Sequence, residues 1–181
     1  DTHTGSYQGT ESFATVEEYD PATDSWSSKS PMPSSRFVHA ACVLDDQIYV
    51  IGGSVSAPFV GILTMIVYDP ATDTWSPPYE LPRAMIGSAA VTHNGKIYVI
   101  GGDLEGNYNR VDEYDPVTNT WTQKADMPSY RDDLSCSILE GKIYAIGGES
   151  DNYAVLNTVE VYDPVTDSWT EADPLLNYRW T

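Results

Sequence analysis

Three arginines at equivalent positions are the residues best suited to bind a ligand. Arg36 and Arg131 each lie three residues after a proline, and Arg179 lies three residues after a leucine. A guanidinium group is a planar donor that matches a carboxylate through two parallel hydrogen bonds. Because the whole chain has only 9 Lys and Arg residues, this column of arginines predicts a binding site for an acidic ligand.

The arginine column has one exception and one neighbour. Met85 holds the equivalent position in the middle of the chain, where Arg83 lies two residues earlier. His39 begins a stretch of small residues and is a further candidate for the same ligand site, although a single histidine is more often a hydrogen-bonded structural residue. The arginines have a structural alternative too, which is pairing with local acids such as Asp132 or Asp133.

Catalytic and metal chemistry have little support in the sequence. Only 3 histidines occur, and they are scattered, without the His or Cys spacing of a metal site. Cys42 and Cys136 both lie in small-residue stretches and are interpreted as core residues. Aspartates recur four residues apart, but Asp-Pro turns explain them better than calcium, because no glycine-turned ligand loop accompanies them. We assign no catalytic residue, no metal site and no cofactor, and we favour a protein that is not an enzyme.

These residues belong to an internal repeat. Four segments of eight residues begin with Tyr-Asp-Pro and end with Trp, and we call them the Tyr–Trp segments: 19–26, 68–75, 114–121 and 162–169. Their spacing of about 50 residues indicates a repeat architecture. The Asp-Pro pair in each one is typical of a turn, because proline fixes φ and the aspartate can bond to the main chain two residues on.

Each complete repeat contains further strand signals. A stretch of small residues leads into a two-residue turn at 45–46, 94–95 or 140–141, and Ile-Tyr-Val/Ala-Ile-Gly-Gly follows. The turn at 94–95 is Asn-Gly, a strong hairpin signal because both central positions of a type I′ turn need positive φ. A third strand ends at each Tyr and a fourth begins at each Trp. One repeat therefore predicts four short antiparallel strands, and no helical periodicity occurs.

The small-residue strand points to the overall architecture. Small side chains suit a crowded axis where several copies of one strand converge, and four-stranded sheets arranged radially about an axis form a β-propeller. We predict an all-β propeller segment of about three and a half blades in one domain. Its parts are 1–31 (third and fourth strands only), 32–80, 81–126, 127–175, and the start of a further inner strand at 176–181.

Paired glycines followed by Tyr and Trp at this spacing resemble kelch repeats over nearly the whole chain. The sequences of these repeats are closer to those of prokaryotic kelch proteins. The resemblance implies a kelch propeller. Such propellers serve as protein-interaction platforms, actin-binding modules or ubiquitin-ligase adaptors, and occasionally as enzymes. In kelch adaptors, arginines that enter the inner strand bind ligand carboxylates, which implies that role for Arg36, Arg131 and Arg179.

Most length variation between the repeats lies after the paired glycines, before the third strand. These variable loops carry the aromatic residues Tyr7, Phe59, Tyr108 and Tyr153. Variable loops on a rigid scaffold commonly carry recognition, and aromatic residues are enriched at binding surfaces. We expect these loops and the arginine column to form the ligand face, the alternative being ordinary surface loops.

The charge of the chain limits its partners. There are 27 acidic and 9 basic residues, for a formal net charge of −18. Such a surface repels phosphate backbones and anionic lipid, so we expect no nucleic-acid and no membrane partner. The sequence does not identify the cellular compartment. We expect an extracellular or periplasmic location if the protein is prokaryotic and a cytoplasmic one if it is a eukaryotic adaptor.

Our main expectation is a non-catalytic binding module for a protein or peptide of acidic character, with a glycan less favoured. The alternatives are a sugar-active enzyme similar to a sialic-acid epimerase and a structural segment of a larger extracellular repeat protein. Propellers have about four to eight blades. We therefore expect this ring to be completed by further blades of a larger protein or by a second copy of the chain.

Overall fold

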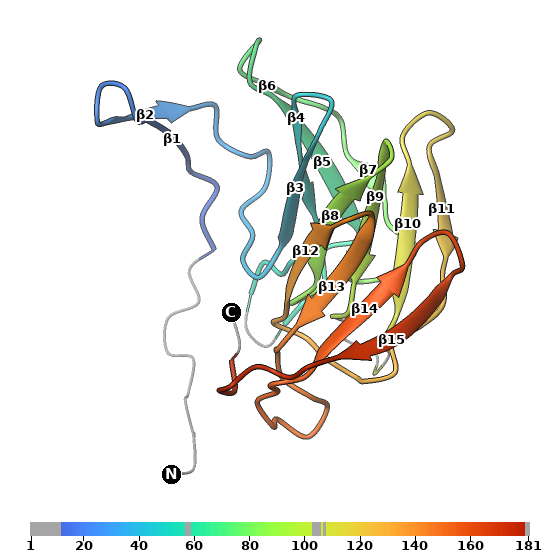
Figure 1. Cartoon of the computed structure of the whole chain (residues 1–181). Helices are drawn as coiled ribbons and strands as arrows, with labels where there is room; N and C mark the ends of the chain where they lie inside the picture. Colours follow the sequence, from blue (N-terminus) through green and yellow to red (C-terminus); the bar gives the residue numbers. More distant parts are fainter. Residues whose placement is uncertain (1–11, 57–58, 103–105, 107, 180–181) are drawn as a thin grey trace.

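The computed structural model shows a row of antiparallel sheets (Figure 1) and describes residues 12–56, 59–102, 106 and 108–179. No helix occurs among these residues, so none is available to cross a membrane. Tyr7 lies outside the described residues. The predicted all-β class is confirmed.

The sheets follow one another along the chain. The N-terminal hairpin consists of β1 (Val16–Asp20) and β2 (Ser25–Lys29). The first sheet contains β3 (Ala40–Leu44), β4 (Gln47–Ile51), β5 (Thr64–Asp69) and β6 (Thr74–Trp75), and β7 (Tyr79–Glu80) also pairs with β5.

The second sheet contains β8 (Ala89–His93), β9 (Lys96–Ile100), β10 (Val111–Asp115) and β11 (Thr120–Gln123). The third contains β12 (Ser135–Leu139), β13 (Lys142–Ile146), β14 (Val159–Asp163) and β15 (Ser168–Ala172). Every pairing is antiparallel and, apart from that of β7 with β5, joins successive strands. The predicted four-stranded blades are thereby confirmed, with β7 as an addition in the first sheet.

The small-residue strands lie side by side at the inner edge of the row. β3 packs against β8, and β8 packs against β12. Cys42 and Cys136 lie on two of these strands and pack against the hydrophobic clusters between sheets. Burial raises the pKa of each thiol to about 12, so both are neutral at ordinary pH. The interpretation of these cysteines as core residues is confirmed.

A chain of main-chain hydrogen bonds connects the segments that lead into these inner strands. The N–H of Gly87 donates to the carbonyl of Val38 at 3.1 Å, and the N–H of Asp133 donates to the carbonyl of Gly87 at 2.8 Å. All three residues have positive φ, which is 47° at Val38, 67° at Gly87 and 45° at Asp133. The blades are thus linked at equivalent left-handed positions, each two residues after a position of the arginine column.

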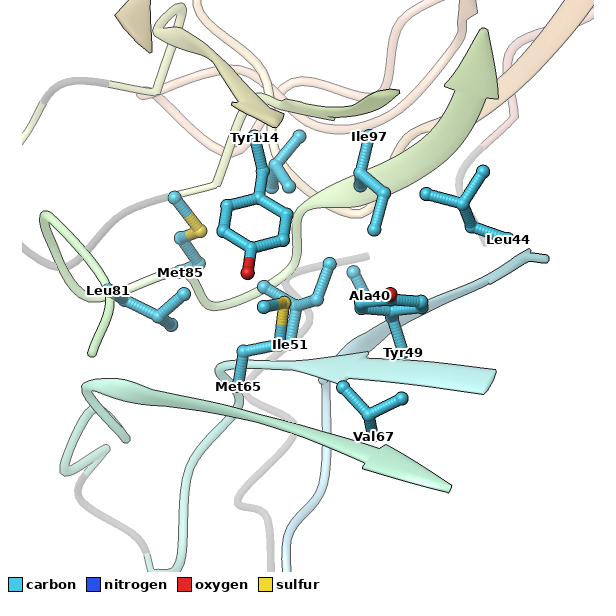
Figure 2. Close-up of a cluster of buried hydrophobic side chains, with 11 residues drawn as sticks. Ala40, Leu44, Tyr49, Ile51, Met65, Val67, Leu81, Met85, Ile97 and Tyr114 are labelled. Carbon is cyan, nitrogen blue, oxygen red and sulfur yellow. The ribbon is translucent and has the colours of Figure 1, made fainter. Parts of the chain in front are cut away.

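The hydrophobic core lies between neighbouring sheets. Between the first and second sheets, Ile51 and Met65 meet Ile97 and Tyr114 (Figure 2). A second cluster fills the next junction and includes Tyr98, Ile100, Ile143, Ala145 and Tyr162. Each buried aliphatic side chain contributes roughly 1.5–3 kcal/mol to stability. The core therefore holds each blade to its neighbours.

The first aspartate of each Tyr–Trp segment forms the expected turn. Its Oδ1 accepts a hydrogen bond from the N–H two residues later, at 2.8 Å for Asp20 and 2.9 Å for Asp69, Asp115 and Asp163. The interpretation of these aspartates as turn residues is confirmed.

The last aspartate and the tryptophan of a Tyr–Trp segment instead hold the preceding blade, and we call this pair a clasp. Asp73 accepts from the N–H of Ser30 at 2.8 Å, and the Nε1 of Trp75 donates to the carbonyl of the same residue at 2.9 Å. Asp167 and Trp169 bind Ala125 in the same way, at 2.9 Å for both bonds. Each clasp grips the residue that lies four positions after the tryptophan of the preceding blade.

The junction between the first and second sheets lacks this clasp. Asn119 replaces the aspartate, and the equivalent residue of the first sheet, Tyr79, pairs with β5. The Nε1 of Trp121 is buried without a hydrogen-bond partner among the described residues. A cavity of about 440 Å³ opens here, lined by Tyr49, Trp75, Tyr79, Tyr114 and neighbouring polar residues.

Candidate functional site

The variable loops and the arginine column meet at one end of the blades, which we call the loop end. Here the N–H of the second glycine of each pair donates to the carbonyl of the residue in the next position of the arginine column. These bonds join Gly53 to Met85 (2.8 Å), Gly102 to Arg131 (3.2 Å) and Gly148 to Arg179 (2.8 Å). The first glycine of each pair has no room for a side chain: a Cβ at Gly52 would lie 2.2 Å from the Met85 oxygen.

Two arginines of the column are buried in the structure. Arg36 is 3% exposed and Arg131 is 0% exposed. The Nη1 of Arg36 donates to the carbonyl of Gly52 at 3.0 Å, and the Nη1 of Arg131 donates to that of Gly147 at 3.0 Å. Each Nη1 also approaches the carbonyl of a threonine that precedes or begins the third strand, at 3.4 Å and 3.3 Å. Both guanidinium groups thus fasten the two ends of a variable loop to each other.

The two buried arginines differ in their acidic partners. Arg131 forms an ion pair with Glu160 at 2.9 Å, and Glu160 is 1% exposed. The pairing acid is therefore neither Asp132 nor Asp133. Arg36 has no ion pair among the described residues, and Ile66 takes the place of Glu160 in its blade. Burial lowers the pKa of both guanidinium groups.

Arg83 supplies the missing guanidinium in the second sheet. Met85 is fully buried in the core. Arg83 lies two residues before Met85. Its Nη2 donates to the carbonyl of Gly101 at 3.1 Å, and its Nε donates to Asp112 at 2.8 Å. Every full blade thus has one arginine bonded to the first glycine of its pair. Asp112 holds the position that Glu160 holds in the third blade. This acid was the signal in the sequence that an arginine, here Arg83, is bound in the second blade as well.

The third blade presents the most exposed candidates. Tyr153 is 84% exposed and has a φ of 61°. Arg179 is exposed as well, and its N–H donates to the carbonyl of Leu156 at 3.0 Å. Leu156 and Tyr153 both belong to the loop 149–157. The hydrogen bond to Leu156 therefore places the segment that carries Arg179 next to this loop. The structure brings these two predicted residues to the same part of the loop end.

The other predicted residues are distributed over the first and second blades. Phe59 is 40% exposed, with its ring centroid 5.7 Å from that of Phe37. Tyr108 is half-buried. His39 is exposed just before β3, where a Cβ on Gly53 would lie 2.9 Å from its own Cβ. All three residues thus lie on other blades than Tyr153.

Serine side chains hold two of the loops in defined shapes. The fully buried Ser54 donates from Oγ to the carbonyl of Val60 at 3.0 Å, and it accepts from the N–H of Val60 at 2.9 Å. In the third blade, the Oγ of Ser150 accepts from the N–H of Ala154 at 3.2 Å. Loops bonded in this way lose little conformational freedom when they bind a partner.

Exposed apolar side chains gather at the loop end. In the variable loops and in the segments before the inner strands, they are Val55, Phe59, Val60, Leu63, Tyr130, Tyr153 and Tyr178. Exposed apolar side chains that form a contiguous patch are a feature of interaction surfaces, and this end of the blades is therefore the candidate binding face.

Carboxyl groups also lie at this end, on the third blade. Asp132 and Glu149 exchange two main-chain hydrogen bonds, at 3.0 Å and 2.9 Å. Burial, together with the charges of Asp133 and Glu149, raises the pKa of Asp132 to about 6. Burial raises the pKa of Asp133 and of Glu149 as well. Within the described part of the chain, no group of three or more such side chains is arranged to hold a metal ion.

The family follows from comparison with known proteins. Residues 64–175 match the family model for the KLHDC2/KLHL20/DRC7 Kelch-repeats domain, and residues 36–78 match the model of the Kelch motif. The first match spans more than half of the chain. The chain belongs to the kelch-repeat family. The resemblance seen in its repeats is thereby confirmed.

Curated kelch proteins match short parts of the chain. The mouse influenza virus NS1A-binding protein homolog is 48% identical over 50 residues, which are 28% of this chain and 8% of that protein. Human Kelch-like protein 4 is 50% identical over 38 residues, or 21% of this chain and 5% of that protein. The matches thus cover only a small share of either relative.

One solved structure shares its fold with nearly the whole chain. The structure of YjhT superposes with a TM-score of 0.75 at 18% sequence identity, covering 94% of this chain and 68% of that one. At this identity the likeness concerns the fold alone. Together with the four-stranded sheets it establishes the predicted propeller architecture.

Proposed function

We propose that this kelch chain is a non-catalytic binding module that recognises a protein or peptide through its loop end. The observation that carries the proposal is the 84% exposure of Tyr153. This tyrosine lies on an internally bonded loop, and further exposed aromatic and aliphatic side chains lie on other segments of the same end of the blades. Large aromatic groups held on ordered loops provide contact area at low entropic cost.

Within this proposal the arginines have two roles. Arg36 and Arg131 are positioning residues, since each ties together the two ends of a variable loop through main-chain carbonyls. Arg179 and His39 are exposed and supply the polar contacts. An acidic side chain of the ligand would meet Arg179, because a guanidinium group binds carboxylates in a bidentate manner.

Selection from a displayed peptide library on the immobilised chain tests this proposal. We expect the selected peptides to lose affinity for the Tyr153→Ser variant, and acidic peptides to lose affinity for Arg179→Glu. The matched controls are Val117→Ser and Val165→Ser. These valines are 91% and 88% exposed in the turns at the opposite end of the blades. Peptides that bind Tyr153→Ser as tightly as the unchanged chain, or that depend on Val165 instead, would contradict the proposal.

We also propose that copies of the chain associate with each other. Trp26 in the N-terminal hairpin is 68% exposed, whereas the tryptophans of the full sheets are half-buried. Tyr19 is 44% exposed, whereas Tyr68, Tyr114 and Tyr162 are at most 4% exposed. Adjacent exposed aromatic rings, here with centroids 5.1 Å apart, are a feature of interaction sites.

A further inference from the structure

A lysine and an aspartate form the same ion pair in the second and third sheets. The lysine begins the second strand of its blade, and the aspartate ends the third. The Nζ of Lys96 lies 3.6 Å from Oδ2 of Asp115, and the Nζ of Lys142 lies 3.9 Å from Oδ2 of Asp163. The repeat thus shows twice that an ammonium group is bound beside this aspartate.

The first sheet keeps the aspartate but lacks the lysine. Asp69 ends β5, and Gln47 begins β4 in place of the lysine. The Oδ1 of Asp69 accepts from the N–H of Ala71 at 2.9 Å, as in the other Tyr–Trp segments. Its Oδ2 has no hydrogen bond or ion pair to any residue that the structure describes. This carboxylate therefore lacks the cation that its two counterparts have.

The cavity between the first and second sheets opens beside this aspartate. Gln47 and Asp69 both line it, and no lysine or arginine does. Its volume of about 440 Å³ is within the range of small-ligand pockets, roughly 300–1,000 Å³. Both of the sheets that form it have their four strands, so the cavity lies at an interior junction of the row of blades.

Two prolines account for the opening of this junction. Pro77 and Pro78 interrupt the fourth strand of the first sheet, because proline has no N–H to donate to the ladder. Beyond them, Tyr79 pairs with Met65, one residue out of register with the strand before the prolines. Tyr79 is thereby removed from the place that a clasp grips in the other junctions, and it lines the cavity instead.

Four aromatic side chains line the cavity together with Asp69. Tyr49 and Tyr114 lie on opposite sides of the junction, with their ring centroids 6.5 Å apart (Figure 2), and Trp75 and Tyr79 are the other two. The faces of aromatic rings attract cations, and the attraction increases where the cation is shielded from water. The cavity thus combines a carboxylate without a cation and aromatic rings, which are the two features that bind an alkylammonium group.

We propose that this cavity binds an alkylammonium group, whose nitrogen pairs with Asp69 and whose carbon chain contacts Tyr49, Tyr79 and Tyr114. The ligand takes the place that a lysine of the same blade takes in the second and third sheets. The formal charge of −18 attracts such a cation at long range as well. A free amine and a lysine of a partner protein both present this group. The site is built on a Tyr–Trp segment and is separate from the loop end.

Titration of the chain with butylammonium chloride tests the proposal. The indole N–H resonance of Trp75 in a heteronuclear NMR spectrum reports on the cavity, and that of Trp26, which does not line it, is the internal reference. We expect a saturable shift at Trp75, and binding of the neutral analogue n-butanol should be weaker by about fivefold. Added salt should weaken the binding of butylammonium only, because it screens the attraction between charges.

Two variants and a matched control make the test specific. Asp69→Asn keeps the oxygen that accepts the turn hydrogen bond but removes the charge, and should weaken butylammonium binding by about fivefold. Gln47→Lys supplies the missing lysine from the chain itself and should abolish the binding. Asp163→Asn removes the same charge from the third sheet and should bind like the unchanged chain. The dispersion of each NMR spectrum shows whether the variant is folded.

Three results would overturn the inference: no saturable shift at Trp75, equal affinity for butylammonium and n-butanol, or folded Asp69→Asn and Gln47→Lys variants that bind like the unchanged chain. An acetylated Gly-Lys-Gly amide distinguishes the two sources of the ammonium group. Tighter binding of this peptide than of butylammonium supports a lysine of a partner protein, and weaker binding supports a free amine. Peptide binding at the loop end is measured with other variants, so either proposal can fail without the other.

Discussion

Asp73 accepts a 2.8 Å hydrogen bond from the main-chain N–H of Ser30, a residue of the preceding blade. Its Oδ1 also accepts from the hydroxyl of Tyr68 at 2.6 Å, and these bonds lower the pKa of its carboxyl group. One side chain thus terminates a turn within its own blade and fixes the neighbouring blade. Each Tyr–Trp segment is therefore a joint between blades as well as a turn.

The tryptophan of a clasp should matter more for stability than Trp26, the exposed tryptophan of the N-terminal hairpin. Trp75→Phe removes the hydrogen bond to the carbonyl of Ser30 and should lower the free energy of unfolding by about 1–2 kcal/mol. Trp26→Phe should change that of the monomer by less than about 0.5 kcal/mol, because its indole is largely in solvent. Urea unfolding at low protein concentration measures both, and equal effects would contradict the interblade role of the clasp.

Loss of Arg131 should expose the cost of a buried unpaired charge. Arg131→Met leaves the carboxylate of Glu160 buried without its cation, and we expect a loss of about 3–5 kcal/mol in the free energy of unfolding. Adding Glu160→Ile should recover much of this, since Ile66 fills the same position in the first sheet. Chemical denaturation compares the two variants. A double variant no more stable than the single one would show that the ion pair is not the main contribution.

Stability should fall as the pH rises through the range in which Asp132 titrates. The folded-state pKa of about 6 is above the ordinary aspartate pKa of 3.8, so between these two pH values the folded chain holds a proton that the unfolded chain has released. The free energy of unfolding then decreases from about pH 4 to about pH 6, by on the order of 2 kcal/mol for this group.

Asp132→Asn should reduce that slope and raise stability at pH 7. Thermal unfolding across pH 4 to pH 7 provides the measurement, read in that interval. Asp151→Asn removes the same charge from the neighbouring exposed loop and controls for the change in net charge. An unchanged slope in Asp132→Asn would argue against a buried, repelled carboxyl at this position.

Val38 should be replaceable with a gain in stability. Its φ of 47° is in the left-handed region, which strains a β-branched residue, and its side chain is 37% exposed. Asparagine tolerates this conformation, so Val38→Asn should raise the free energy of unfolding by about 1 kcal/mol. Val43→Asn, at a 58% exposed position within β3, is the control and should not stabilise. Calorimetry distinguishes the two outcomes, and a destabilised Val38→Asn would mean that this valine has contacts which outweigh its strain.

The strands could be predicted because their signals are local. The turn at Asn94-Gly95 depends only on the φ values that these two residues adopt, and the strands on either side of it recur with the repeat. The broken arginine column was harder to interpret. Met85 interrupts the column, yet Arg83 bonds to the carbonyl of Gly101 from two residues earlier. A long side chain can approach one carbonyl from more than one main-chain position.

The sequence by itself determined the repeat, the strand order, the kelch family and the position of the arginines at the loop end, because each follows from spacing or from a turn that a few adjacent residues specify. Only the tertiary structure decided that Arg36 and Arg131 are buried and that Asp73 and Trp75 grip Ser30 in another blade. Burial and contacts between blades depend on how far sheets distant in sequence approach each other. That approach is set by packing of the whole row of blades, which no single repeat encodes.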